Sequence, residues 1–132
     1  SALPLAAALG GCATIMPTEQ AVSITGEIAY RERIALPRTA QIEVELQDVS
    51  LADAPSRTIA RQAFSADGRQ VPIAFSMTVD QRRIDDRGRY SVSARITDSA
   101  GRLMFISDTH NGVLFDGRTA IDMGTIHLIK TR

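Results

Sequence analysis

The sequence has little of what several common kinds of site require. Its 132 residues include one cysteine, no tryptophan and only 5% aromatic residues. A single thiol can form neither an intramolecular disulfide nor a thiolate metal cluster. So few aromatic rings leave few platforms on which bases or sugars could stack. Stability must therefore come from a packed core of Val, Ile, Leu, Met and Phe.

The chain also lacks an excess of charge of either sign. Lys plus Arg and Asp plus Glu both total 15, so no global field would attract nucleic acid, and we expect no nucleic-acid partner. Charged residues make up 23% and hydrophobic residues 44%, which is the balance of a folded chain rather than a disordered one. The length suits a single domain.

The N-terminal apolar run is too short to span a bilayer, which takes about 20 residues. Residues 2–11 are uncharged and end in small residues directly before Cys12, a pattern typical of the end of a secretory signal. The run Leu9, Gly10, Gly11 and Cys12 resembles the lipobox of bacterial lipoproteins. We expect lipidation at Cys12; the alternative is an Ala-rich helix with a buried free thiol. The sequence starts at Ser1 and has neither an initiator Met nor a basic region before the apolar run. We therefore expect it to begin partway through the signal.

Lipidation divides the chain into three parts. Residues 1–11 would be the signal remnant with its lipobox, 12–20 the lipidated cysteine and a short tether, and 21–132 the folded domain. Several acyl chains on one cysteine anchor a protein stably, whereas a single chain holds only marginally. By resemblance to other lipoproteins, Ala13 in place of Asp favours the periplasmic face of the outer membrane.

Behind the tether, apolar and polar residues alternate with the period of two that is typical of half-buried β-strands. The inward-facing sets are Val22, Ile24, Ile28 and Tyr30; Ile42, Val44 and Leu46; Val71, Ile73, Phe75, Met77 and Val79; and Tyr90, Val92, Ala94 and Ile96. Leu103–Ser107 and Met123–Ile129 are further strands, and 57–64 and 113–115 are weaker candidates. The pattern predicts an all-β fold, a small β-sandwich or partly open barrel of seven or eight mostly antiparallel strands.

Glycine and proline residues indicate where this alternation is interrupted by bulges, strand ends or turns. Gly26 shares an inner face, which indicates a bulge or the close approach of another strand. Pro72 indicates an edge strand or a strand start. The run 98–101 ends in Gly101 and predicts a hairpin built on a type I turn.

Candidate metal ligands are few. His110 and His127 lie 17 residues apart, a spacing that fits no metal site, and His127 points outward in its strand. Asp108, Asn111 and Asp116 could offer oxygens to calcium, but their spacing matches no twelve-residue cation loop. We therefore predict no metal.

Catalytic candidates are equally weak. Asp80, Asp85 and Asp86 could be imagined as an acid and base pair, yet carboxylates interleaved with arginines are normally solvated ion pairs. The sequence contains no Gly-x-Ser-x-Gly, Ser-x-x-Lys or phosphate-loop motif. We expect no enzyme and no cofactor. The remaining candidates are surfaces, either an exposed strand edge or an apolar groove that holds a helix or an acyl chain.

Several segments together resemble the YbaY-like and YscW-like family of small outer-membrane lipoproteins. The resemblance covers about Val22 to Leu128, and its most recognisable pieces are 30–37 with Ala40, 44–54, 71–75 and 90–96. The YscW-like members are known as type III secretion lipoprotein chaperones, or pilotins. The resemblance implies a β-sandwich and, in the pilotin branch, binding of a secretin subunit's C-terminal segment.

Two functions are compatible with this resemblance. The first is a binding module that escorts a secretin or another envelope component to the outer membrane. The second is a general envelope lipoprotein with a structural role or a role in holding a small ligand or lipid, like the uncharacterised YbaY-like members. The sequence does not assign the binding surface to any residues.

Overall fold

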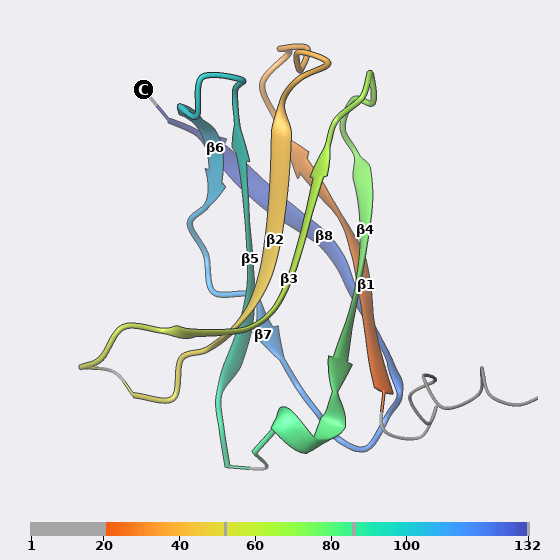
Figure 1. Ribbon diagram of the computed structural model, residues 1–132, viewed down its shortest axis with the longest axis vertical. Coiled ribbons are helices and arrows are strands. Elements are labelled where there is room, and N and C mark those ends of the chain that lie inside the picture. Colours follow the sequence, from red (N-terminus) through yellow and green to blue (C-terminus); the bar gives the residue numbers. More distant parts are fainter. Residues whose placement is uncertain (1–20, 52, 86, 132) are drawn as a thin grey trace, which may run out of the picture.

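The domain is built of β-strands joined by turns and loops (Figure 1). The computed structural model describes residues 21–51, 53–85 and 87–131. Its strands are β1 (Ala21–Tyr30), β2 (Gln41–Asp48), β3 (Arg57–Ser65), β4 (Ile73–Asp80), β5 (Tyr90–Thr97), β6 (Leu103–Ser107), β7 (Gly112–Val113) and β8 (Ala120–Lys130), and a short 3-10 helix, η3 (Gln81–Arg83), follows β4. The signal remnant, the lipobox with Cys12, the tether and Asp86 lie outside the described residues. Among those described, no helix is long and apolar enough to cross a membrane.

All eight strands belong to one sheet in the order β3-β2-β5-β6-β8-β1-β4, with β7 also paired to β5. The pairs are antiparallel except that of β1 with β8, which is parallel. The sheet curls until its two edge strands, β3 and β4, run side by side, so the sheet is nearly closed (Figure 1). The predicted all-β fold of seven or eight mostly antiparallel strands is confirmed.

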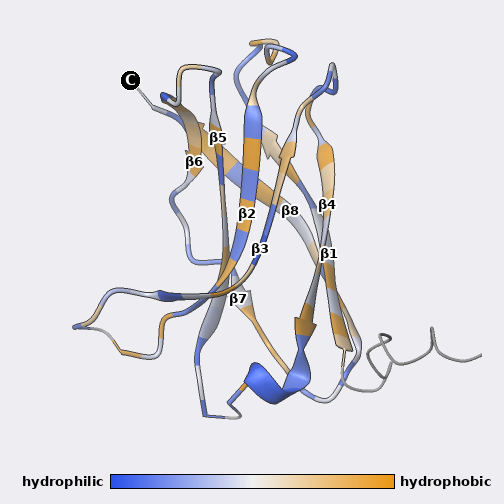
Figure 2. Ribbon diagram, in the orientation of Figure 1, coloured by the Kyte–Doolittle hydropathy of each residue, from blue (hydrophilic) through white to orange (hydrophobic). Residues whose placement is uncertain are grey.

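The core lies inside the curled sheet, and the alternation read from the sequence decides which side chains enter it. Every residue of the four predicted inward-facing sets is buried except Val71, which is half-buried and precedes β4. The two neighbours of Val44 on β2 point outward. Figure 2 shows the resulting alternation of apolar and polar residues along β2. Phe105, Ile126 and Leu128 complete the core from β6 and β8. His127, between the last two, is exposed as predicted.

Gly26 marks a bulge where three strands come together. The register of β1 against β8 shifts between Thr25 and Glu27. A Cβ atom at Gly26 would lie 2.8 Å from the Phe75 ring and 2.9 Å from the Gly124 carbonyl oxygen. Both readings of this glycine, the bulge and the close approach, are confirmed.

Two side-chain hydrogen bonds connect the edge strand β3 with the edge strand β4 and with η3, which follows β4. The Ser76 backbone N–H donates to Oε1 of Gln62 at 2.9 Å, and Nη1 of Arg83 donates to the Ile59 carbonyl at 2.5 Å. These bonds satisfy part of the exposed strand edge, which would otherwise be free to pair with another chain. Pro72 directly precedes β4, an edge strand, in agreement with its predicted position.

Some strand boundaries differ from the sequence prediction, and β4 begins at Ile73 rather than at Val71. β7 covers only Gly112–Val113, because Phe115 turns to pack edge-to-face on Tyr90 with ring centroids 5.4 Å apart. β8 begins at Ala120 rather than at Met123, because its first residues pair in parallel with β1. The predicted hairpin turn is present: Gly101 has φ +85° and Asp98 donates its N–H to the Arg102 carbonyl at 2.8 Å.

Candidate functional site

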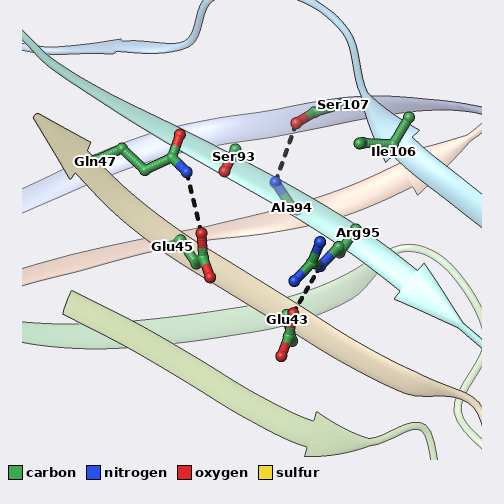
Figure 3. Close-up of a pocket in the computed structure, with 8 residues that line it drawn as sticks. All are labelled: Glu43, Glu45, Gln47, Ser93, Ala94, Arg95, Ile106 and Ser107. Carbon is green, nitrogen blue, oxygen red and sulfur yellow. Dashed lines mark hydrogen bonds and ion pairs between the residues drawn. The ribbon is translucent and has the colours of Figure 1, made fainter. Parts of the chain in front are cut away.

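A depression of about 220 Å³ lies on the outer face of the sheet, over β2, β5 and β6 (Figure 3). Its polar lining comes from outward residues of β2 and β5 together with Ser107 of β6, and its apolar side chain is that of Ile106. Ala94 also borders the hollow, although its side chain belongs to the core. The full lining is Glu43, Glu45, Gln47, Ser93, Ala94, Arg95, Ile106 and Ser107.

The depression exists because β5 changes partner along its length. β6 pairs with β5 only at its end, from Arg95 to Thr97, and β7 pairs with its beginning, at Tyr90 and Ser91. The residues between β6 and β7 leave the sheet in that interval. The Ala94 N–H donates instead to the Ser107 hydroxyl at 3.0 Å, which leaves a hollow beside β5 without an unsatisfied donor.

A row of paired charges crosses the same face. Nε of Arg95 donates to one carboxylate oxygen of Glu43 at 2.7 Å, and Arg61 on β3 binds the other oxygen. The hydrogen bond from Arg95, followed by that from Arg61, lowers the pKa of Glu43. Both oxygens of Glu43 are therefore engaged within the protein.

Glu45 is less fully paired than Glu43. Nε2 of Gln47 donates to one of its oxygens at 3.1 Å, and Nε of Arg61 lies 3.9 Å from the other. Amide hydrogen bonds leave the carboxylate charge in place, and an ion pair at that distance is weak. Glu45 is thus the carboxylate in the depression that an incoming cation or N–H donor could still use.

This arrangement suits binding rather than catalysis. It offers a carboxylate, two serine hydroxyls and a small apolar floor, which together fit a segment with one polar and one apolar side. In the part of the chain that the structure describes, no group of three or more His, Cys, Asp or Glu could hold a metal ion.

The residues considered for calcium do not assemble into a site. Nε of Arg118 pairs with Asp116 at 2.9 Å and lowers its pKa, and the Asn111 amide donates to the Thr109 carbonyl at 3.1 Å. His110 lies beside Gly112 in the connection between β6 and β7, whereas His127 is on β8.

The acidic run after β4 is likewise engaged locally. Asp80 pairs with Arg82 at 2.6 Å, and hydrogen bonds from this arginine lower the pKa of Asp80 to about 2. Asp85 accepts the Arg87 backbone N–H at 2.9 Å. The expected ion pairing with arginine is confirmed for Asp80, whose side chain is half-buried.

Sequence reasoning missed the depression. It did identify the outer face of β2 as polar, which is the one local signal of Glu43 and Glu45. It could not place Arg61 and Arg95 on either side of Glu43, because that depends on β2 lying between β3 and β5. It could not locate the hollow either, since the hollow follows from the interval between β6 and β7.

The fold and this surface define a small β-domain with a polar, partly apolar hollow, and comparison with known families gives its class. The family model described as the type III secretion system lipoprotein chaperone (YscW) matches residues 19–124. The chain belongs to this family of lipoprotein chaperones. The family resemblance seen in the sequence is confirmed.

Two individual relatives define the comparison further. The chain is 34% identical over 119 residues to the uncharacterised lipoprotein YbaY of Escherichia coli strain K12; the match takes in 90% of this chain and 62% of that protein, so the chain spans less than two thirds of this relative's length. The structure of an alternative pilotin from the type II secretion system of Vibrio cholerae is 50% identical, with a TM-score of 0.76, over 85% of this chain and 98% of that one.

Proposed function

We propose that this protein is an outer-membrane pilotin, anchored through Cys12 on the periplasmic side, that binds the C-terminal segment of a secretin subunit. The observation that carries the proposal is the 50% identity to an alternative pilotin over 98% of that chain. At that identity and TM-score the two domains share their fold. The protein acts by binding and positioning its partner, with no covalent step.

The surface that supports this binding best is the depression over β2, β5 and β6. Its apolar floor, the side chain of Ile106, suits an apolar side chain of the secretin segment. Glu45 suits a lysine, an arginine or a backbone N–H on the polar side of that segment. Glu43 is already held by two arginines, so we assign it to orienting Arg95 rather than to the partner.

The test is calorimetric titration of the detergent-purified chain with a synthetic C-terminal segment of the secretin encoded in the same genome. Ser93→Trp fills the depression and is expected to weaken binding at least tenfold. Thr78→Trp places the same side chain on the exposed face of β4, away from the depression, and should bind like the wild type. Equal binding by both variants would exclude this surface, and absence of wild-type binding would contradict the pilotin assignment.

Glu45→Gln refines the same test. It keeps the side-chain shape and removes the charge, so a partner with a cation at this point should lose affinity while the fold is unchanged. A secretin segment that binds Glu45→Gln normally would place its contacts on the apolar floor instead.

The anchor requires a separate test. Cys12→Ser should leave the β domain folded and move the protein from the membrane fraction to the soluble periplasm, because anchor and core use different residues. A variant that stays in the membrane fraction after a salt wash would contradict lipidation at Cys12. If the envelope-purified wild type recovers lipid and no secretin, the general envelope lipoprotein function is favoured.

A further inference from the structure

The largest exposed apolar side chains of the described residues are not spread evenly. Leu51 is 72% and Leu114 is 68% exposed, against 45% for Ile129 and 37% for Ile34. A single exposed leucine is ordinary. Two of them on loops at the same end of a small sheet need a physical reason.

Both leucines flank the short segment that leads into β5. The loop of Leu51 is held there by two hydrogen bonds, from Val49 N–H to the Arg89 carbonyl at 2.8 Å and from Arg89 N–H to the Ser50 hydroxyl at 2.9 Å. On the other side, Leu114 lines a shallow hollow together with Arg89 and Tyr90. Leu51 and Leu114 thus lie on loops on either side of Arg89, and these three residues together are called here the leucine patch.

The leucine patch lies at the end of the sheet from which the tether starts. Ala21, the first residue of β1, pairs with Asp80, the last residue of β4, and the chain from Asp80 runs through η3 to Arg89. Figure 1 shows the start of β1, η3 and the loop of Leu51 all in the lower half of the molecule. Eight residues separate Cys12 from Ala21, and so many span at most about 30 Å.

We propose that the leucine patch docks on the surface of the bilayer that holds the anchor, with Leu51 and Leu114 at the boundary of headgroups and acyl chains. This proposal rests on the proposed lipidation of Cys12. The guanidinium of Arg89 reaches the phosphates while its methylene stem lies along the apolar boundary. Docking at this end leaves the depression over β2, β5 and β6 open to the periplasm.

Two leucines alone would hold a free protein only weakly on a membrane. A short tether changes this, because it turns docking into an intramolecular step at an effective concentration in the millimolar range. Net charge contributes little here, since the arginines Arg82 and Arg83 at this end are accompanied by Asp80 and Asp85. The apolar side chains therefore carry the contact.

The absence of tryptophan makes the test direct. Leu51→Trp and Leu114→Trp each give a single reporter in the lipidated protein, which is reconstituted into phosphatidylcholine vesicles with brominated acyl chains. The matched control is Ser99→Trp, an exposed position in the turn after β5, at the opposite end of that strand. Leu51→Trp and Leu114→Trp should be blue-shifted and quenched at least twofold, and Ser99→Trp should not.

Vesicle flotation of the same samples separates this proposal from the anchor. If the protein floats with the vesicles but Leu51→Trp and Leu114→Trp are quenched no more than Ser99→Trp, membrane docking of the patch is overturned and the anchor stands. If the protein does not float, both are overturned. Unquenched Leu114→Trp that also blocks the secretin segment would assign the patch to a protein partner instead.

Discussion

The side-chain amide of Gln70 forms hydrogen bonds with both backbone polar groups of Leu36. Its Oε1 accepts the Leu36 N–H at 2.7 Å, and its Nε2 donates to the Leu36 carbonyl at 3.1 Å. Leu36 lies in the connection between β1 and β2, where no neighbouring strand is available, and its side chain is buried in the core. One side chain thus does what a paired strand does elsewhere in the sheet.

Gln70→Ala should lower the free energy of unfolding by about 1–3 kcal/mol, because it leaves a partly buried donor and acceptor without partners. Urea denaturation would measure the loss. Gln41→Ala is the matched control, since the side chain of Gln41 makes only a long, exposed bond to the Thr39 carbonyl, and it should change stability by less than about 0.5 kcal/mol. Equal effects would show that the Leu36 connection needs no such partner.

Gly26→Ala tests the bulge in β1. The added methyl would meet both the Phe75 ring and the backbone of β8 at less than 3 Å, and overpacking of this kind typically costs about 1–3 kcal/mol. The thermal midpoint should fall accordingly. Ser23→Ala, on the outer face of the same strand, should leave it nearly unchanged. A stable Gly26→Ala variant would mean that β1 and β8 can separate locally without loss.

The pairing of Glu43 predicts how stability responds to acid. Its pKa is lowered in the folded state, so its contribution is present above the unfolded-state value of about 4.3 and is lost as the pH falls through the lower folded-state value. Wild type should therefore exceed Glu43→Gln in stability near neutral pH, and the gap should narrow below about pH 4.

Urea midpoints at neutral and acidic pH would measure this gap. In an Arg95→Gln background the Glu43→Gln change should lower the free energy of unfolding by less, because the hydrogen bond that contributes most to the lowered pKa of Glu43 is already absent. A gap that stays constant with pH would indicate that Glu43 stabilises the sheet by packing alone.

The raised pKa of Tyr30 predicts how stability responds to alkaline pH. Its ring stacks on Phe105 with centroids 3.9 Å apart, and its hydroxyl donates to the Ile34 carbonyl. Burial, and secondarily the charge of Glu32, raise the pKa of Tyr30. Because the folded-state pKa is raised, the stability it contributes is present below the ordinary value of about 10 and is lost as the pH rises through the folded-state value.

Tyr30→Phe keeps the stacked ring and removes the hydroxyl. It should cost about 0.5–1.5 kcal/mol at neutral pH and abolish the part of the phenolate absorbance that appears only at strongly alkaline pH. A titration curve that keeps this late component in Tyr30→Phe would show that Tyr30 is not its source.

The sequence predicted the strands well because their phase is a local property. Alternation along 73–79 requires no knowledge of neighbouring strands, and the buried residues there agree with it. The parallel pairing of β1 with β8 joins residues about a hundred positions apart, such as Ile24 and Ile121. Nothing in either segment specifies that pairing, because parallel and antiparallel partners present the same alternating faces.

In the candidate site, too, the local pattern was predictable and the neighbouring strands were not. The polar character of Glu43 and Glu45 was visible in the sequence, but the neighbours that distinguish them were not. Arg61 and Arg95 come from strands on opposite sides of β2. Which of the two glutamates remains open to a partner is therefore a property of strand order, which local patterns do not encode.

Val44→Asp provides the sharpest test of the strand phase. Val44 is fully buried between two outward-facing glutamates, so β2 already carries a carboxylate one residue to either side. On the inner face the same group would be unpaired in the core at a cost of several kcal/mol, against a total stability of about 5–15 kcal/mol. Val44→Asp should unfold the domain, as followed by circular dichroism, while Glu45→Asp should melt like the wild type. Unchanged melting of Val44→Asp would mean that β2 is shifted by one residue, since such a slip exchanges the two faces of a strand.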